Sequence, residues 1–234
     1  MGKTIFVCGT DTGVGKTVVT GALLAWLNAK GIRAGGFKPT ESGCGGMRRH
    51  LKRADAEFLK KRAAMPEPLD AINPYYFREA LAPGVAAKRL GRIISFSKIA
   101  RKLKALEKNY DLILAEGAGG LLVPLQGKKT TLDLIRFLKV PVLLVGRLGL
   151  GTINHTLLTV EVLKRNRIPL LGVILNETTP RMSLAEKTNP SVLKAYGVPV
   201  WGVFPHLKGK SRLFEFDNFD GDVLERFFLK GVHE

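Results

Sequence analysis

Glycines, a lysine and a threonine near the N-terminus form a phosphate-binding pattern. The segment Gly9-Thr10-Asp11-Thr12-Gly13-Val14-Gly15-Lys16-Thr17 lies between an apolar run and a helical pattern. Glycines at such a place let backbone N–H groups turn toward phosphate oxygens, and the helix that follows adds partial positive charge. A lysine in the position of Lys16 reaches the β- and γ-phosphates, and a hydroxyl in the position of Thr17 can ligate Mg²⁺. The segment therefore predicts a P-loop that uses ATP and magnesium.

The spacing of these glycines differs from the usual P-loop pattern. That pattern leaves four residues between the first glycine and Gly-Lys-Thr, which puts the glycine where this chain has Thr10, and Gly9 lies one residue earlier. Chance glycines in a strand–turn–helix are the alternative, but Gly-Lys-Thr in this context favours the P-loop. The residues of this segment expected to contact the nucleotide are Gly13, Val14, Gly15, Lys16, Thr17 and Val18.

Two acidic residues are candidates to complete a magnesium site with Thr17. Glu116 follows an apolar run and opens the segment Glu116-Gly117-Ala118-Gly119-Gly120, and Asp55 lies beyond the loop after the second apolar run. Carboxylates are oxygen ligands of the kind that Mg²⁺ takes in ATP-binding proteins. A surface loop acid is the alternative for Glu116, and an ordinary acid at a helix start is an equally good interpretation of Asp55.

Three further segments follow apolar runs and could contact ligands. Lys38 ends the second run and is interpreted as a second phosphate clamp or a substrate cation. Residues 149–155 join an apolar run to a helical pattern, so their N–H groups either bind another anion or form a plain glycine-rich turn. Asn176 ends a later run, where an amide can read the edge of a base, although a lone asparagine is weak support. His155 has no metal-ligand spacing around it and is expected to pack or to cap a helix.

Short apolar runs alternate with helical patterns along the whole chain, and this alternation predicts the fold. It is typical of an α/β protein with a mostly parallel sheet and helices on both faces, here of the P-loop NTPase type, and we expect one domain over residues 1–234. Ligands of such sheets bind at the carboxyl ends of the strands. The strands are expected at 4–8, 34–38, 112–115, 140–146, 170–175 and 200–204, and the helices at 16–30, 54–63, 97–109, 132–138, 154–167, 190–196 and 221–230, with Asn189 and Pro190 starting the helix at 190.

The chain is strongly basic, with 37 basic and 20 acidic residues and a formal net charge of +17. Such a charge suggests nucleic acid or an acidic membrane as a partner. The charges are spread along the chain, however, and only Phe58 interleaves with the densest run as a stacking platform would. We therefore expect a solvated helix face, with no nucleic-acid or membrane partner. That run comprises Arg48, Arg49, Lys52, Arg53, Lys60, Lys61 and Arg62.

Cysteine usage and hydropathy predict a cytoplasmic protein. Two cysteines form no disulfide framework, which favours a reducing compartment. Cys8 lies in an apolar run and is expected to be buried, whereas Cys44 lies in a glycine-rich loop that can expose it. The N-terminal apolar run is too short for a signal peptide, and the longest apolar stretch, residues 140–145, is far below membrane-spanning length.

Taken together, these segments resemble the dethiobiotin synthetase family, from residue 4 to about residue 207. That family carries Gly-x-Asp-Thr-x-x-Gly-Lys-Thr, which the first loop matches with its unusual glycine spacing. The order and spacing of the remaining motifs make the resemblance specific. They are Lys38-Pro39 with Ser42-Gly43, Asp55-Ala56, Glu116 to Gly120, Gly151-Thr152-Ile153-Asn154-His155, Asn176 in the place of an adenine-contacting asparagine, and Pro205 in a late turn on the adenine side.

The resemblance implies an ATP-dependent cyclo-ligase of biotin biosynthesis. Its substrates would be 7,8-diaminononanoate, CO₂ and ATP, and the reaction would pass through a carbamate and a carbamic–phosphoric anhydride before a ureido ring closes. By this resemblance, Lys16 and Lys38 would be catalytic. The same resemblance would place Mg²⁺ on Thr17, Asp55 and Glu116, the diamine beside Thr12 and Ser42, and the substrate carboxylate on Gly151 and Asn154 in a turn from the partner subunit of a homodimer.

Two other classes of P-loop protein are alternatives. Enzymes that amidate cobyrinic acid need a glutaminase domain with a nucleophilic cysteine, for which this chain has no room. Partition and septum-positioning ATPases bind DNA or membrane and carry a lysine early in the P-loop, where this chain has Thr10, Asp11 and Thr12. The chain departs from the dethiobiotin synthetase pattern at the loop after Ser42, at Glu177, where aspartate is common, and beyond residue 208.

Overall fold

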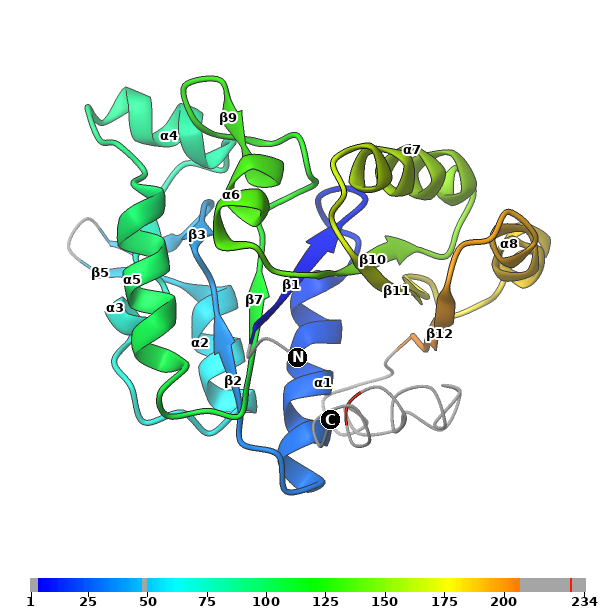
Figure 1. Ribbon diagram of the computed structural model, residues 1–234, viewed down its shortest axis with the longest axis horizontal. Helices are drawn as coiled ribbons and strands as arrows, with labels where there is room; N and C mark the ends of the chain where they lie inside the picture. The colour runs from blue at the N-terminus through cyan, green and yellow to red at the C-terminus, as the bar shows by residue number, and fades with distance from the viewer. Residues whose placement is uncertain (1–3, 48–49, 207–227, 229–234) are drawn as a thin grey trace.

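The centre of the molecule is a six-stranded sheet. The computed structural model describes residues 4–47, 50–206 and 228. In it the strands lie in the order β12-β11-β10-β1-β7-β2, and every neighbouring pair is parallel (Figure 1). The predicted parallel α/β fold is confirmed. The six strands are β1 (Thr4–Gly9), β2 (Ala34–Phe37), β7 (Leu112–Glu116), β10 (Val142–Arg147), β11 (Leu170–Asn176) and β12 (Val200–Phe204).

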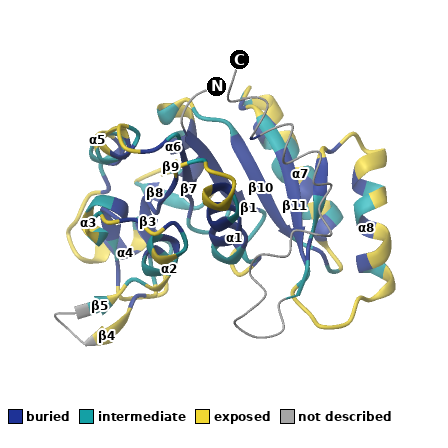
Figure 2. Cartoon of the chain, turned by 90° about the horizontal axis from the view of Figure 1, so that it is seen from below, coloured by how far each residue is buried: buried dark blue, intermediate teal, exposed yellow. Residues whose placement is uncertain are grey.

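Helices cover both faces of this sheet (Figure 2). α1 and α2 pack on each other and on β2, and α7 packs on β10 and β11. None of the helices in the described ranges is long and apolar enough to cross a bilayer. The helices are α1 (Lys16–Ala29), α2 (Ala54–Arg62), α3 (Leu69–Ile72), α4 (Pro83–Arg89), α5 (Phe96–Leu106), α6 (Thr131–Leu138), α7 (Thr152–Arg165) and α8 (Leu184–Ala195).

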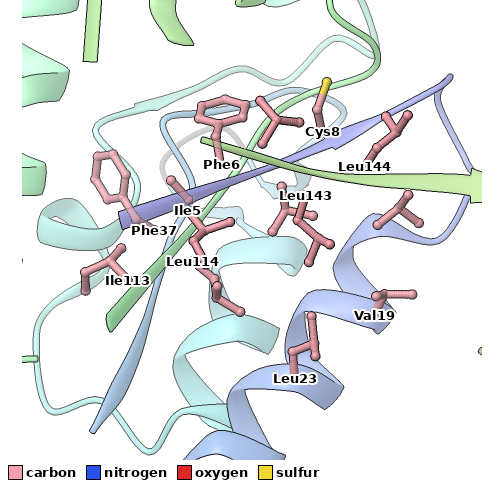
Figure 3. Close-up of a cluster of buried hydrophobic side chains, with 14 of the residues drawn as sticks. Ile5, Phe6, Cys8, Val19, Leu23, Phe37, Ile113, Leu114, Leu143 and Leu144 are labelled. Atoms are coloured by element: carbon pink, nitrogen blue, oxygen red, sulfur yellow. The ribbon is translucent and has the colours of Figure 1, made fainter. Parts of the chain in front are cut away.

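The core forms because the central strands are apolar on both faces. Every residue of β1 is buried, as are all five of β7. Val19 and Leu23 of α1 are fully buried against one face of the strands (Figure 3). A parallel strand buried on both faces is a continuous apolar run and not an alternating one, which is why these strands were recognisable in the sequence.

Small elements that were not predicted lie between the main strands and helices along the chain. They add short strand pairs and two short helices in segments with little hydrophobic periodicity. The pairs are β3 (Thr40–Glu41) with β6 (Tyr75–Tyr76), β4 (Gly45–Met47) with β5 (His50–Lys52), and β8 (Pro124–Gln126) with β9 (Lys129–Thr130).

One predicted helix start is wrong. The helix expected to begin at Asn189 and Pro190 begins at Leu184, because Ser183 and Glu186 form a capping box there and Pro190 lies inside the helix. Asn189 instead donates to the carbonyls of Leu148 and Gly149. The helix expected at 221–230 lies outside the described residues.

Two further expectations also need correction. The basic run is not one helix face, because Lys52 belongs to the β4–β5 hairpin and Arg53 pairs with Asp70 and lies over the ring of Tyr76. Cys44, expected in a loop that can expose it, is 2% exposed, whereas Cys8 is buried as predicted.

Candidate nucleotide-binding and catalytic site

A cavity of about 580 Å³ lies where β1, β2 and β7 end. Parallel strands present their carboxyl ends at one edge of a sheet, and the loops after them build the walls. The structure thus brings together predicted residues from four separate segments of the chain. Those lining the cavity are Thr12, Gly13, Gly15, Lys16, Thr17, Val18, Lys38, Ser42, Asp55 and Glu116.

The P-loop has the backbone that its glycines predict. Gly13 and Gly15 have φ angles of 74° and 92°, which residues other than glycine rarely adopt. Helix α1 starts directly after Gly15. The Lys16 ammonium folds back and donates to the carbonyl of Asp11 at 2.8 Å. A Cβ on Gly9 would lie 2.6 Å from that ammonium and 2.7 Å from the backbone carbonyl of Asp11, and the fixed carbonyl favours a glycine at this position.

Lys38 lies in an ionic cluster with the two acids predicted for the metal, the buried Glu116 and the partly exposed Asp55. Its Nζ is 2.5 Å from Oε1 of Glu116 and 2.7 Å from Oδ2 of Asp55, and Lys38 itself is 2% exposed. Thr17 donates to the same Oε1 of Glu116 at 2.7 Å. Although burial lowers the pKa of Lys38, the charges of Glu116 and Asp55 outweigh it and hold that pKa above its ordinary value.

Lys16 has the opposite electrostatic setting. Burial lowers its pKa, and the positive charge of Lys38 lowers it further, while Glu116 acts in the other direction. The two lysines of the cavity therefore differ, because Lys38 forms ion pairs with carboxylates whereas Lys16 donates to a carbonyl of the P-loop.

The donor atoms of this cluster fit a hard cation. Among the described residues, Oε2 of Glu116 is buried without a hydrogen-bond partner, and a bound cation or a water would satisfy it. Within the described ranges, no group of three or more His, Cys, Asp or Glu could hold a metal by itself. A cation at Thr17, Asp55 and Glu116 would therefore take part of its ligands from phosphate oxygens and water, as Mg²⁺ commonly does.

The predicted adenine-side residues lie apart from this cavity. Nδ2 of Asn176 donates to the carbonyl of Val14 at 3.0 Å, so the asparagine supports the back of the P-loop. A Cβ on Gly15 would meet that same Nδ2 at 2.0 Å. Pro205 follows β12 directly and is half-buried. A contact of either residue with adenine remains a prediction.

The turn predicted to bind a substrate carboxylate also lies outside the cavity. Gly151 caps α7 with φ of 90°, and both it and Asn154 are exposed. His155 lines a neighbouring groove of about 510 Å³ together with Thr10, Thr12 and the exposed leucines Leu122 and Leu158.

Sequence reasoning missed two residues beside the site. Arg147 ends β10 and donates to Oδ2 of Asp11 at 2.7 Å, tying the P-loop to the neighbouring strand. Glu41 is 4% exposed and lines the cavity, and burial raises its pKa. The segment that contains Lys38 pointed to this region, but only the tertiary structure shows what the Glu41 carboxylate contacts.

Comparison with known proteins supports the same family over nearly the whole chain. A model of the AAA domain family matches residues 3–212. The ATP-dependent dethiobiotin synthetase of Thermodesulfovibrio yellowstonii is 42% identical over 232 residues, covering 94% of this chain and 97% of that enzyme. The enzyme of the same name from Anaeromyxobacter dehalogenans is 47% identical over 178 residues, covering 75% of this chain and 77% of the relative.

A solved structure supports the fold. The septum site-determining protein MinD from Pyrococcus horikoshii, complexed with Mg-ADP, matches with a TM-score of 0.54 at 19% identity, covering 87% of this chain and 82% of that one. At this identity the likeness shows the fold alone. The full-length sequence identity above carries the narrower assignment: the chain belongs to the family of ATP-dependent dethiobiotin synthetases, which are ligases that form C–N bonds.

Proposed function

We propose that the protein converts 7,8-diaminononanoate, CO₂ and ATP into dethiobiotin, ADP and phosphate. The observation that carries the proposal is the pair of buried lysines, Lys16 and Lys38, in one cavity with the acids of a cation site. The carbamate and the γ-phosphate are both anions and repel each other. Their reaction therefore needs a site with positive charge that offsets the repulsion. The relatives named above support the substrates.

The lysines have separate tasks in this proposal. One amine of the substrate adds to CO₂, and the carbamate oxygen attacks the γ-phosphorus, so that ADP leaves. The second amine then attacks the carbonyl carbon, loses a proton, closes the ureido ring and displaces phosphate. Lys16 binds the β- and γ-phosphates from the P-loop. Lys38, held by Glu116 and Asp55, offsets the charge between carbamate and phosphate during transfer.

We propose that Thr17, Asp55 and Glu116 hold Mg²⁺, which neutralises charge between β- and γ-oxygens when bound. The partnerless Oε2 of Glu116 supports this assignment. We expect excess chelator to abolish turnover, and Asp55→Ala and Glu116→Ala each to lower it. Full activity of the wild-type protein in chelator, measured as phosphate release, would contradict the metal requirement.

We infer a homodimer whose sites span the interface. The turn with Gly151 and Asn154 is exposed and does not line its own chain's cavity, which supports its use by a second copy. Leu122 and Leu158 are 63% and 59% exposed and line one groove, and Leu150 is 87% exposed; exposed large apolar side chains favour an interface. Ser42 and Thr12 would contact the diamine from the chain's own side.

We also propose that the protein is cytoplasmic and acts on small molecules without nucleic acid or membrane. The two free, buried cysteines are compatible with a reducing compartment. Within the densest basic run, Arg53 is already paired with Asp70 and with the Tyr76 ring, which makes it less available to a polyanion.

Product analysis tests the reaction. Purified protein is incubated with diaminononanoate, bicarbonate, ATP and Mg²⁺, and the product is identified by mass spectrometry. We expect dethiobiotin, with phosphate released only when both diamine and bicarbonate are present. Phosphate release that depends instead on DNA or lipid vesicles would contradict the proposal and favour an ATPase switch.

A further inference from the structure

Glu41 is a buried carboxylate that the proposed reaction does not use. It lies on β3, three residues after Lys38, and is 4% exposed. A carboxylate is rarely buried unless hydrogen bonds or charges compensate it. Its partners therefore indicate what it does.

Both oxygens of Glu41 bond the start of α2. Oε1 accepts from the N–H of Asp55 at 3.0 Å, and Oε2 accepts from the N–H of Ala56 at 3.1 Å. The first N–H groups of a helix have no partner within the helix, and the N-cap residue of α2, Arg53, makes no side-chain cap bond. Glu41 thus serves as the cap from another element, and its charge complements the positive end of the helix.

The capped residue is one that we assign to the cation site. The backbone of Asp55 is bonded to Glu41, and its carboxylate lies 2.7 Å from Nζ of Lys38. Two bonds from one carboxylate hold the first turn of α2 against the cavity wall. Without them, the first turn is free to fray, and the carboxylate of Asp55 moves with it.

We propose that Glu41 is a positioning residue that fixes the Asp55 carboxylate for a divalent cation. The proposal rests on the metal role proposed for Asp55. In this proposal Glu41 acts through the backbone, because each of its oxygens accepts one of the helix N–H groups.

The test compares Glu41→Gln with a matched control on the same helix turn. Glutamine keeps the length of the side chain but has one acceptor oxygen, and its NH₂ group faces a backbone N–H. Glu57→Gln removes a carboxylate from the same first turn, where Glu57 is half-exposed and bonds no other described side chain. Mn²⁺ binding is measured by electron paramagnetic resonance with the β,γ-imido analogue of ATP, without turnover.

We expect Glu41→Gln to weaken Mn²⁺ binding about tenfold, because it removes the helix cap and its charge-assisted hydrogen bonds. Glu57→Gln should change Mn²⁺ binding less than twofold. Amide hydrogen exchange at Asp55 and Ala56 should become faster only in Glu41→Gln. In an Asp55→Asn background, Glu41→Gln should have no further effect on Mn²⁺ binding.

Unchanged Mn²⁺ binding in Glu41→Gln would overturn the proposal, as would a further loss of the same size in the Asp55→Asn background. Should Asp55→Asn itself leave Mn²⁺ binding intact, the proposal is also wrong. If Glu41→Gln does not fold, Glu41→Asp decides, because it keeps the charge but shortens the reach and should give the same two changes. Failure to form dethiobiotin while these binding results hold would refute the proposed reaction and leave the role of Glu41 standing.

Discussion

Lys38 is buried against two carboxylates, and this setting decides what its substitution should do. Lys38→Met keeps most of the bulk and removes the charge, so we expect turnover to fall on the order of 10²-fold, as for loss of one electrostatic stabiliser. ATP affinity should change much less, because the P-loop and Lys16 remain. Lys16→Met should reduce both. Steady-state kinetics with saturating substrates and calorimetric ATP binding separate the two cases.

The control for this prediction is Lys61→Met, which removes an exposed lysine from α2. It should behave as wild type in both measurements. Turnover of Lys38→Met within about twofold of wild type would show that Lys38 does not contribute to the catalytic step. A lower melting temperature in Lys38→Met is expected in addition, since the buried Glu116 and the partly exposed Asp55 would then lose their ion-pair partner.

Gly9 offers a second prediction at the scale of one residue. In Gly9→Ala the new methyl group would lie 2.6 Å from Nζ of Lys16 and 2.7 Å from the Asp11 carbonyl, so the lysine must move. We expect ATP binding to weaken roughly tenfold, which corresponds to a loss of about 1.4 kcal/mol in binding free energy. Gly45→Ala is the control, because its added carbon meets nothing within 4 Å. Equal ATP affinity in the two variants would show that Lys16 adapts without cost.

At the scale of elements, α8 holds the turn that begins α7. Nδ2 of Asn189 donates to the carbonyls of Leu148 and Gly149, and Asn189 is buried. Asn189→Ala should destabilise the fold by about 1–3 kcal/mol, because the buried Leu148 carbonyl loses its donor, whereas the Gly149 carbonyl keeps the N–H of Thr152. Under the proposed dimer it should also raise the KM for diamine and leave the KM for ATP unchanged.

Asn166→Ala is a suitable control for that variant, since Asn166 bonds only Val162 within its own helix end. Urea denaturation measures the change in stability, and initial rates at varied diamine measure KM. A KM for diamine that stays at the wild-type value in Asn189→Ala would mean that the turn does not serve the substrate.

Local patterns predicted the elements, whereas contacts between distant segments decided what was missed. The six sheet strands and the P-loop were predictable because continuous apolar runs and glycine spacing are properties of neighbouring residues. The clustering of Lys38, Asp55 and Glu116 followed from strand ends meeting at one edge. The cap from Glu41 to α2 joins residues 14 and 15 positions apart, and no short pattern encodes it.

The start of α8 shows a different reason for failure. Asn-Pro is a common helix start, but Ser183 and Glu186 form a complete capping box six residues before Asn189. The capping box satisfies two backbone groups at once, so the helix starts there and not at Asn189. Proline is then tolerated at position 190, and Asn189 is released to bond Leu148 and Gly149.

At the scale of the whole molecule, the exposed Leu122 and Leu158, which line the groove that also contains His155 and Thr10, predict a dimer. Leu158→Glu places a charge on the face of α7 that lines this groove, and we expect it to convert the dimer to a monomer with much reduced turnover. Leu90→Glu is the control, because Leu90 is similarly exposed, at 53%, and lies after α4 outside that groove. Light scattering that shows a fully active wild-type monomer would rule out shared sites.

The two buried lysines also differ in a way that affects chemical labelling. An amine reacts with acylating reagents only when it has lost its proton. Burial and the charge of Lys38 lower the pKa of Lys16, whereas the two carboxylates raise that of Lys38. An acyl-phosphate derivative of ATP should therefore modify Lys16 and spare Lys38, which peptide mapping by mass spectrometry would reveal. Lys38, which is proposed to offset charge during phosphoryl transfer, would then not be detected by the reagents commonly used to find ATP-site lysines.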